Sequence, residues 1–126
     1  MTFLNFSEPL KNNRDFLRAY NRGKNSASPL FVVYARQNKN GKRNRIGITV
    51  STKIGKAVVR NHIRLRVREI YRLHELEFNC GYDIVIVARQ KSRFAEFAEM
   101  EKDIIELSSR LGLLTKKDEE NTAVSD

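Results

Sequence analysis

Several residue types on which catalytic and metal sites depend are scarce in this sequence. It has one cysteine, Cys80, two histidines, His62 and His74, and no tryptophan. A single cysteine excludes an intramolecular disulfide, and three such residues do not make a set of zinc ligands. Asp83 and Asp103 have no carboxylate partner at catalytic spacing, and the glycines match no known phosphate-binding loop. We therefore predict no catalytic residues and no metal ligands in the protein.

Long apolar runs are also missing. No segment reaches the roughly 18–20 apolar residues that a membrane-spanning helix needs. The first residues, MTFLNFSEPLKNN, lack the apolar stretch and the small-residue cleavage site of a signal peptide. With only one cysteine, these absences favour a soluble cytoplasmic protein that does not span a membrane.

Positive charge is abundant and is concentrated in the middle of the chain. The 24 lysines and arginines exceed the 15 acidic residues and give a net charge of +9. Residues 36–72 hold twelve basic residues and one acidic residue, whereas residues 73–126 hold seven and twelve. Such a field favours an anionic partner, either a nucleic acid or an acidic membrane surface, and charge alone does not choose between them.

Hydrophobic patterns predict three helices and three strands. The helices are expected at 14–22, capped by Asn12 or Asn13 and ended by Gly23, at 57–76, and at 94–114. The strands are expected at 30–37, 45–51 and 82–89, with a hairpin turn at Asn40 and Gly41 between the first two. The order of elements predicts an α+β sandwich, in which helices cover a small mixed, mainly antiparallel sheet.

The length fits one domain, which we place at residues 1–114. The last twelve residues, TKKDEENTAVSD, are polar and have no periodic pattern. We predict that residues 115–126 form a disordered tail.

The predicted helix at 57–76 combines an apolar stripe with a basic row. The stripe is Val59, Ile63, Val67, Ile70 and Leu73. The row is Arg60, Arg64, Arg68 and Arg72, with Asn61 beside it, and Glu69 is the only acidic residue between Lys56 and Arg72. Arginines at i,i+4 spacing repel one another, so the pattern favours a polyanion that supplies the opposite charge. The alternative is a solvated basic face without a ligand.

Neighbouring residues favour the first interpretation. Lys53 and Lys56 precede the helix, and the turn from Lys39 to Arg45 adds further positive charge. Gly55 leads into the helix, whose first N–H groups could also bind a phosphate.

The stretch KIGKAVVRNHIRLRVRE resembles the arginine-rich motif of the protein subunit of bacterial ribonuclease P. Positions that match the pattern K-x-G-x-A-V-x-R-N-x-x-K-R-x-x-R are Lys53, Gly55, Ala57, Val58, Arg60, Asn61 and Arg68, and Arg64 replaces the usual lysine. The likeness extends over residues 10–89. The sequence departs from the pattern at Leu65 and Arg66, where the family usually has a basic and then an apolar residue, and at His62, where many relatives are basic.

The resemblance implies a function and a fold. Family members bind a large catalytic RNA and assist its hydrolytic removal of the 5′ leader from precursor tRNA, with Mg²⁺ held chiefly by the RNA. The expected partners are thus ribonuclease P RNA and precursor tRNA, with no DNA. An unusual left-handed βαβ crossover is implied around the arginine-rich helix. The RNA-binding residues carried over are Lys53, Lys56, Arg60, Asn61, Arg64 and Arg68.

The resemblance also implies a cleft for the single-stranded leader, for which the chain offers Phe16, Tyr20 and Tyr34. Aromatic rings stack on bases of any sequence, as a variable leader requires. The alternative is that Phe16 and Tyr20 only pack the first helix on the sheet.

Two other functions remain open from the residues. A structural RNA-binding protein, similar to a ribosomal protein or an RNA chaperone, would use the basic helix alone. A DNA-binding regulator could place the helix in a major groove, but a strand rather than a second helix precedes it.

Overall fold

The computed structural model describes residues 6–38 and 43–115. A helix, α1 (Asn13–Arg22), follows a short strand, β1 (Ser7–Pro9). The other strands are β2 (Lys24–Ala27), β3 (Phe31–Gln37), β4 (Asn44–Val50) and β5 (Tyr82–Ala88). The long helix α2 (Ala57–His74) lies between β4 and β5, and α3 (Phe97–Arg110) follows β5. Short 3₁₀ helices are η1 (Thr52–Ile54), η2 (Glu75–Glu77) and η3 (Gln90–Phe94).

The five strands form one mixed sheet in the order β1-β4-β5-β3-β2. The central strand β5 pairs parallel with β4 and antiparallel with β3, and it is buried along nearly its whole length. This position explains its almost continuous apolar sequence. The α+β class and the mixed sheet are confirmed, but the sheet is not mainly antiparallel: β1–β4 and β4–β5 are parallel pairs, and β2–β3 and β3–β5 are antiparallel pairs.

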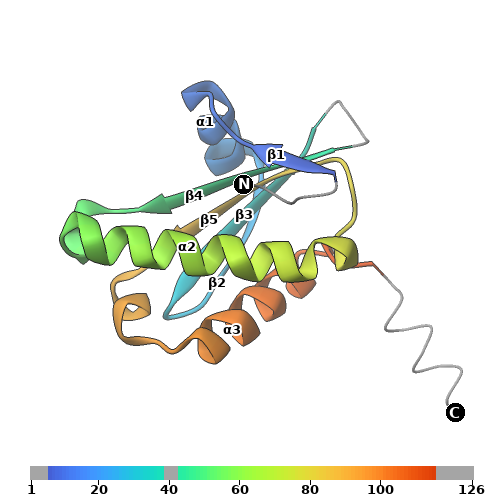
Figure 1. Cartoon of the computed structure of the whole chain (residues 1–126). Helices are drawn as coiled ribbons and strands as arrows, with labels where there is room; N and C mark the ends of the chain where they lie inside the picture. The colour runs from blue at the N-terminus through green and yellow to red at the C-terminus, as the bar shows by residue number, and fades with distance from the viewer. Residues whose placement is uncertain (1–5, 39–42, 116–126) are drawn as a thin grey trace, which may run out of the picture.

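The connection from β4 through α2 to β5 is left-handed. In Figure 1 both strands point to the left, β5 lies below β4, and α2 crosses on the near side of the sheet. The crossover that the family resemblance implies is therefore present, as an exception to the usual right-handed connection.

Helices cover the two faces of the sheet unequally. The main core joins α2 and α3 to one face and contains buried residues of the three inner strands, such as Phe31, Val33, Val50, Ile84 and Ile86. A smaller cluster joins α1 to the other face through Leu10, Ala19 and Val85. Figure 1 shows α1 near one end of the sheet, whereas α2 and α3 extend along the opposite face.

The prediction that β3 and β4 pair with each other in a hairpin is wrong. Both strands form as expected, but β5 lies between them and pairs with each. The turn residues Asn40 and Gly41 are outside the described residues. An Asn-Gly turn signal indicates a local reversal of the chain, whereas the almost continuous apolar sequence of β5 favours burial at the centre of the sheet.

Two predicted apolar stripes need correction. On α2, Leu73 is half exposed and Tyr71 is buried instead, where its hydroxyl bonds Ser7 at 2.6 Å and its ring packs on Phe78. The predicted helix at 94–114 begins only at Phe97, because Glu96 and Glu99 form a capping box there. Phe94 precedes it in η3 and is 81% exposed.

Two of the strands, β1 and β2, were not predicted. β1 is three residues long, and β2, in the predicted loop GKNSASP, is largely exposed at the sheet edge; neither has an apolar alternation to reveal it.

The described part of the chain ends at Thr115, which donates its backbone N–H to the carbonyl of Glu77. Residues 116–126 are outside the described residues, so the domain boundary and the disordered tail remain predictions.

Candidate nucleic-acid interface

The arginine row of α2 follows a spiral rather than a straight line. Arg60 and Arg64 are half-buried, whereas Arg68 and Arg72 are exposed. Residues four apart turn by about 40° around a helix axis, so each arginine lies farther from the core than the one before it. The row thus leaves the margin of the core and ends on the outer surface, instead of lying opposite the core throughout.

The arginines differ in the partners that hold them. Arg60 donates from Nε to the Gly55 carbonyl at 3.1 Å, and Arg72 forms a two-pronged ion pair with Glu69. Across residues 6–38 and 43–115, no acidic side chain pairs with Arg64 or Arg68. These two guanidinium groups therefore carry uncompensated charge on a folded helix, where they can contact phosphate in pairs of hydrogen bonds.

The remaining predicted residues lie around the start of α2. Lys53, Lys56 and Asn61 are exposed, and the helix has neither a side-chain cap nor an acidic residue in its first turn. Lys53 is in η1, one turn of chain before α2 begins. The six RNA-binding residues carried over from the resemblance thus share one helix and the turn that leads into it.

The departure from the family pattern causes no burial of charge. Leu65 is 53% exposed, and Arg66 and His62 are exposed as well. Arg66 therefore lies at the surface and not in the apolar stripe, because the stripe turns toward Tyr71 at the C-terminal end of α2.

Three aromatic residues meet on the opposite face of the sheet. Tyr20 of α1 lies edge-on against Tyr34 of β3, with ring centroids 4.9 Å apart, and Phe16 lies 6.5 Å from Tyr20. All three rings are half-buried, so their other sides face solvent. The structure thus brings together the three residues predicted for the leader cleft; Tyr20 is the most fixed, since its hydroxyl also bonds Thr49 at 3.1 Å.

Gly47 of β4 allows α1 to approach the sheet. A Cβ atom at this position would lie 2.5 Å from the Phe16 ring. A side chain at this position would displace the ring, so the arrangement of Phe16, Tyr20 and Tyr34 depends on Gly47, which no pattern in the sequence identified.

A charged network closes one end of this face, and sequence reasoning missed it. Arg45 makes two hydrogen bonds to Asp83 and one to Asp15, and Asn38 donates to Asp83 at 3.1 Å. Hydrogen bonding to Asp83 raises the pKa of Arg45, against the opposing effect of burial. Because Asp15 is on α1 and Asp83 on β5, the network fixes the helix to the sheet. Asp83 thus has a structural role, because Arg45 links it to Asp15 of α1.

A second basic segment lies next to the start of α2. β4 and β5 are parallel, so the segments that follow them emerge at the same end of the sheet. Arg93 of η3 donates to the carbonyl of Ile54 in η1 at 3.2 Å and lies 5.5 Å from the ring of Phe94. The run KSR at residues 91–93 was visible in the sequence, but nothing in the sequence placed it beside Lys53 and Lys56.

Two other kinds of feature are absent from the described part of the chain. Within it, no group of three or more histidine, cysteine, aspartate or glutamate residues could hold a metal ion. No helix among those residues is long and apolar enough to cross a membrane.

Comparison with known proteins decides the family. The model of the family described as Ribonuclease P matches residues 4–112. The chain belongs to the ribonuclease P protein family. The ribonuclease P protein component of Clostridioides difficile is 40% identical over 107 residues, which cover 84% of this chain and 93% of that protein. The corresponding component of Alkaliphilus metalliredigens is 36% identical over 84% of this chain and 95% of its own length.

Solved ribonuclease P proteins share the fold. The protein from Staphylococcus aureus has a TM-score of 0.79 and 31% identity, covering 88% of this chain and 99% of that one. The protein from Thermotoga maritima has a TM-score of 0.71 and 33% identity, covering 78% and 92%. As a ribonuclease P protein component, the chain is part of a ribonucleoprotein endoribonuclease of tRNA processing, with ribonuclease P RNA as its partner.

Proposed function

We propose that this ribonuclease P protein binds its catalytic RNA through α2 and holds the 5′ leader of precursor tRNA against the aromatic cluster. The observation that carries the proposal is the separation of two surfaces on opposite faces of one sheet. The unpaired arginines lie on the side of α2, and the rings of Phe16, Tyr20 and Tyr34 lie on the side of α1. One protein can thereby contact two RNA molecules at once.

The α2 surface suits a structured RNA. Arg64 and Arg68 have no acidic partner among the described residues, and Lys53, Lys56 and Asn61 extend the surface to the start of the helix. Phosphate binding by such residues releases counterions and should depend steeply on salt. The repulsion between like charges along α2 is then relieved in the complex.

The aromatic cluster suits an unpaired strand. Each base that stacks on an exposed ring face gains about 1–3 kcal/mol whatever its identity. Phe16 and Tyr34 are the better candidates for direct contact, since the Tyr20 ring supports Tyr34 and its hydroxyl is bonded to Thr49. Leaders of different sequence could therefore be held in the same way.

In this proposal the RNA, and not the protein, catalyses the hydrolysis. We infer that Mg²⁺ ions held chiefly by RNA activate the hydrolysis, while protein side chains position the leader and screen repulsion between the two RNAs. The protein would act in the cytoplasm, without a DNA or membrane partner. The alternative is a structural RNA-binding protein, for which the α2 surface alone would be needed.

Reconstitution tests the proposal. Ribonuclease P RNA should cleave a precursor tRNA faster at low magnesium when the folded protein is present, and Arg60→Ala or Tyr34→Ala should reduce the stimulation. Lack of stimulation with the cognate RNA would favour the structural RNA-binding alternative.

A further inference from the structure

Phe94 is the most exposed large apolar residue in the described part of the chain. It is 81% exposed, ahead of Leu76 at 74%. The predicted helix at 94–114 includes Phe94, but the capping box of Glu96 and Glu99 begins α3 only after it. Ala95 is buried at this point, and the phenyl ring beside it is left in solvent.

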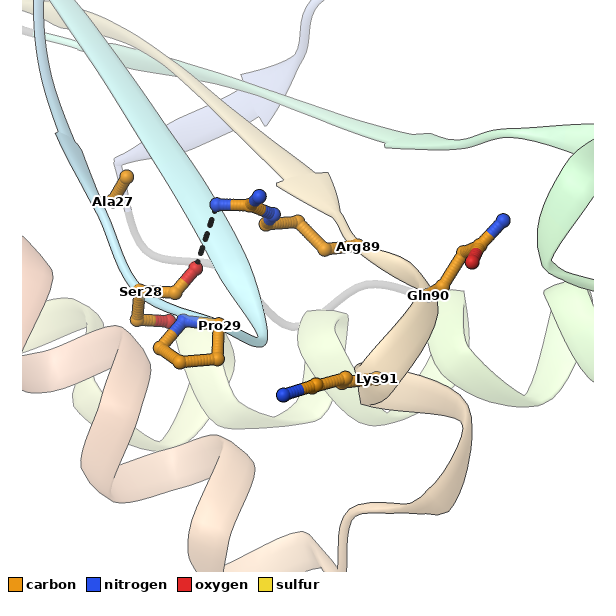
Figure 2. Close-up of a pocket in the computed structure, with 6 residues that line it drawn as sticks. All are labelled: Ala27, Ser28, Pro29, Arg89, Gln90 and Lys91. Atoms are coloured by element: carbon orange, nitrogen blue, oxygen red, sulfur yellow. Dashed lines mark hydrogen bonds between the residues drawn. The ribbon is translucent and has the colours of Figure 1, made fainter.

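Hydrogen bonds fix the backbone that carries the ring. Arg89, which precedes η3, donates from Nη1 to the Ser28 carbonyl at 3.1 Å, a bond drawn in Figure 2. The buried Ser92 donates its hydroxyl to the Arg89 carbonyl at 2.6 Å, and the Ala95 N–H bonds the Ser92 carbonyl at 3.2 Å. Phe94 thus stands on a preformed turn, which loses little conformational freedom when a partner covers the ring.

Arg93 supports the ring and joins it to the start of α2. Its guanidinium carbon lies 5.5 Å from the centroid of the Phe94 ring, and its Nη1 donates to the Ile54 carbonyl at 3.2 Å. The next carbonyl in the chain, that of Gly55, accepts from Arg60 of α2 at 3.1 Å. The ring and the first arginine of the α2 row are therefore attached to two successive peptide groups.

The surroundings of the ring are positive. Lys53 and Lys56 precede and follow these two peptide groups in the chain and are exposed, as is Arg93. No acidic side chain of the described residues pairs with Arg93, and Glu96 already accepts from the Glu99 N–H in the capping box. An exposed ring among cations suits single-stranded nucleic acid, because a base can stack on the ring while the cations bind phosphates.

The ring belongs to the α2 side of the sheet. Ile54 and Ala95 are both part of the main core that α2 and α3 cover. The aromatic cluster lies on the other face, and Phe94 does not line the pocket drawn in Figure 2. A base on Phe94 would thus belong to the RNA that α2 binds, and not to the leader.

We propose that Phe94 stacks on an unpaired base of ribonuclease P RNA, with Arg93 against the ring and Lys53 and Lys56 on adjacent phosphates. The inference rests on the proposed binding of the catalytic RNA through α2 and adds a contact of a different kind to it. Cations that bind phosphate release counterions, whereas stacking releases none. The two kinds of contact therefore respond differently to salt.

The affinity for ribonuclease P RNA, measured over a range of salt, tests the stack. Phe94→Ala should weaken binding about tenfold at every salt concentration, with the slope of log affinity against log salt unchanged. Phe94→Tyr should bind as the wild type does, whereas Phe94→Leu, which is apolar but has no ring, should lose nearly as much as Phe94→Ala.

A matched control is Leu76→Ala, at a comparably exposed apolar residue in η2, beyond the far end of α2. It should bind the RNA as the wild type does. Thermal unfolding of the Phe94 variants and of Leu76→Ala should match the wild type, because both side chains are exposed.

A fluorescent probe reports the stack directly. The protein has no tryptophan, so Phe94→Trp introduces the only indole. Its emission should be quenched when ribonuclease P RNA is added alone, since a base stacked on an indole quenches its fluorescence. Leu76→Trp should keep its emission under the same conditions.

Four results would overturn the inference. Wild-type affinity in Phe94→Ala or in Phe94→Leu would exclude stacking. Quenching of Phe94→Trp only after precursor tRNA is added would assign the base to the substrate. Emission that changes with protein concentration in the absence of RNA would make the ring a contact between protein copies. The proposed binding through α2 fails by a different result, namely wild-type affinity for the RNA in Arg68→Ala.

Discussion

Tyr20 lies edge-on against Tyr34, with the ring centroids 4.9 Å apart and the planes at 78°. The contact joins α1 to the sheet, and the Tyr20 hydroxyl adds a bond to Thr49. Tyr20 therefore orients the Tyr34 ring, which we propose to contact the leader, while the Tyr20 hydroxyl is hydrogen-bonded within the protein.

This arrangement predicts different effects for two substitutions of Tyr20. Tyr20→Phe keeps the ring and should cost about 1 kcal/mol of unfolding free energy, with the preference for precursor tRNA unchanged. Tyr20→Ala also removes the support of Tyr34, so it should cost about 3 kcal/mol and reduce that preference. Urea denaturation and tRNA binding measure the two effects. Loss of the preference in Tyr20→Phe would mean that the hydroxyl contacts RNA directly.

The Arg45 network predicts a large effect on stability. Asp83 is 1% exposed in its side chain, and Arg45 supplies two of its hydrogen bonds. Arg45→Ala should lower the unfolding free energy by about 3 kcal/mol, because it leaves a buried carboxylate without its cation. The control is Arg110→Ala on α3, which breaks an exposed pair with Glu106 and should cost less than about 0.5 kcal/mol. Equal costs for both variants would contradict the role given to the network.

The contacts of His74 lead us to expect that the stability of the protein depends on pH. Its ring nitrogens bond Glu77 and Glu101, and although burial lowers its pKa, these two partners outweigh burial and raise it. The stabilisation is fully present below the unfolded-state pKa of about 6.5 and is lost as pH rises through the higher folded-state pKa.

The comparison of His74→Gln with wild type checks this sign. Chemical denaturation should show a larger loss of stability at about pH 5.5 than at about pH 8.5. A larger loss at the higher pH would contradict the direction of the shift.

Salt dependence tests the α2 surface. Arg68→Ala should weaken binding to ribonuclease P RNA and should reduce the slope of log affinity against log salt by about one. Lys102→Ala removes an equal charge from α3 and should leave the slope unchanged. A wild-type slope in Arg68→Ala would mean that this guanidinium group contacts no phosphate.

Residues with a strong local pattern could be predicted from the sequence. α1 begins at Asn13, one residue before the predicted start, and ends before Gly23 as expected. The apolar run at 82–88 forms a buried strand. Phe16, Tyr20 and Tyr34 come together as the predicted leader cleft requires, because α1 packs on the face of the sheet that carries Tyr34.

Features that depend on pairing at long range could not be predicted. The position of β5 between β3 and β4 requires a choice of sheet order, which no local turn signal contains. The contact of Gly47 with Phe16 and the bond of Arg93 to Ile54 likewise depend on elements that are distant in sequence. Tyr71 lies in the core where Leu73 was predicted. Its hydroxyl is hydrogen-bonded to Ser7 and Asn44, which are distant in sequence.

The claim of two RNA surfaces is tested most directly by comparing Arg68→Ala and Tyr34→Ala in the same assay. For each variant, the affinity for ribonuclease P RNA and the ratio of precursor to mature tRNA binding are measured. Arg68→Ala should weaken the first and keep the second, whereas Tyr34→Ala should keep the first and lower the second by the equivalent of about 1–3 kcal/mol. If both variants weakened both quantities to the same extent, the two surfaces would not be separate and the account would be contradicted.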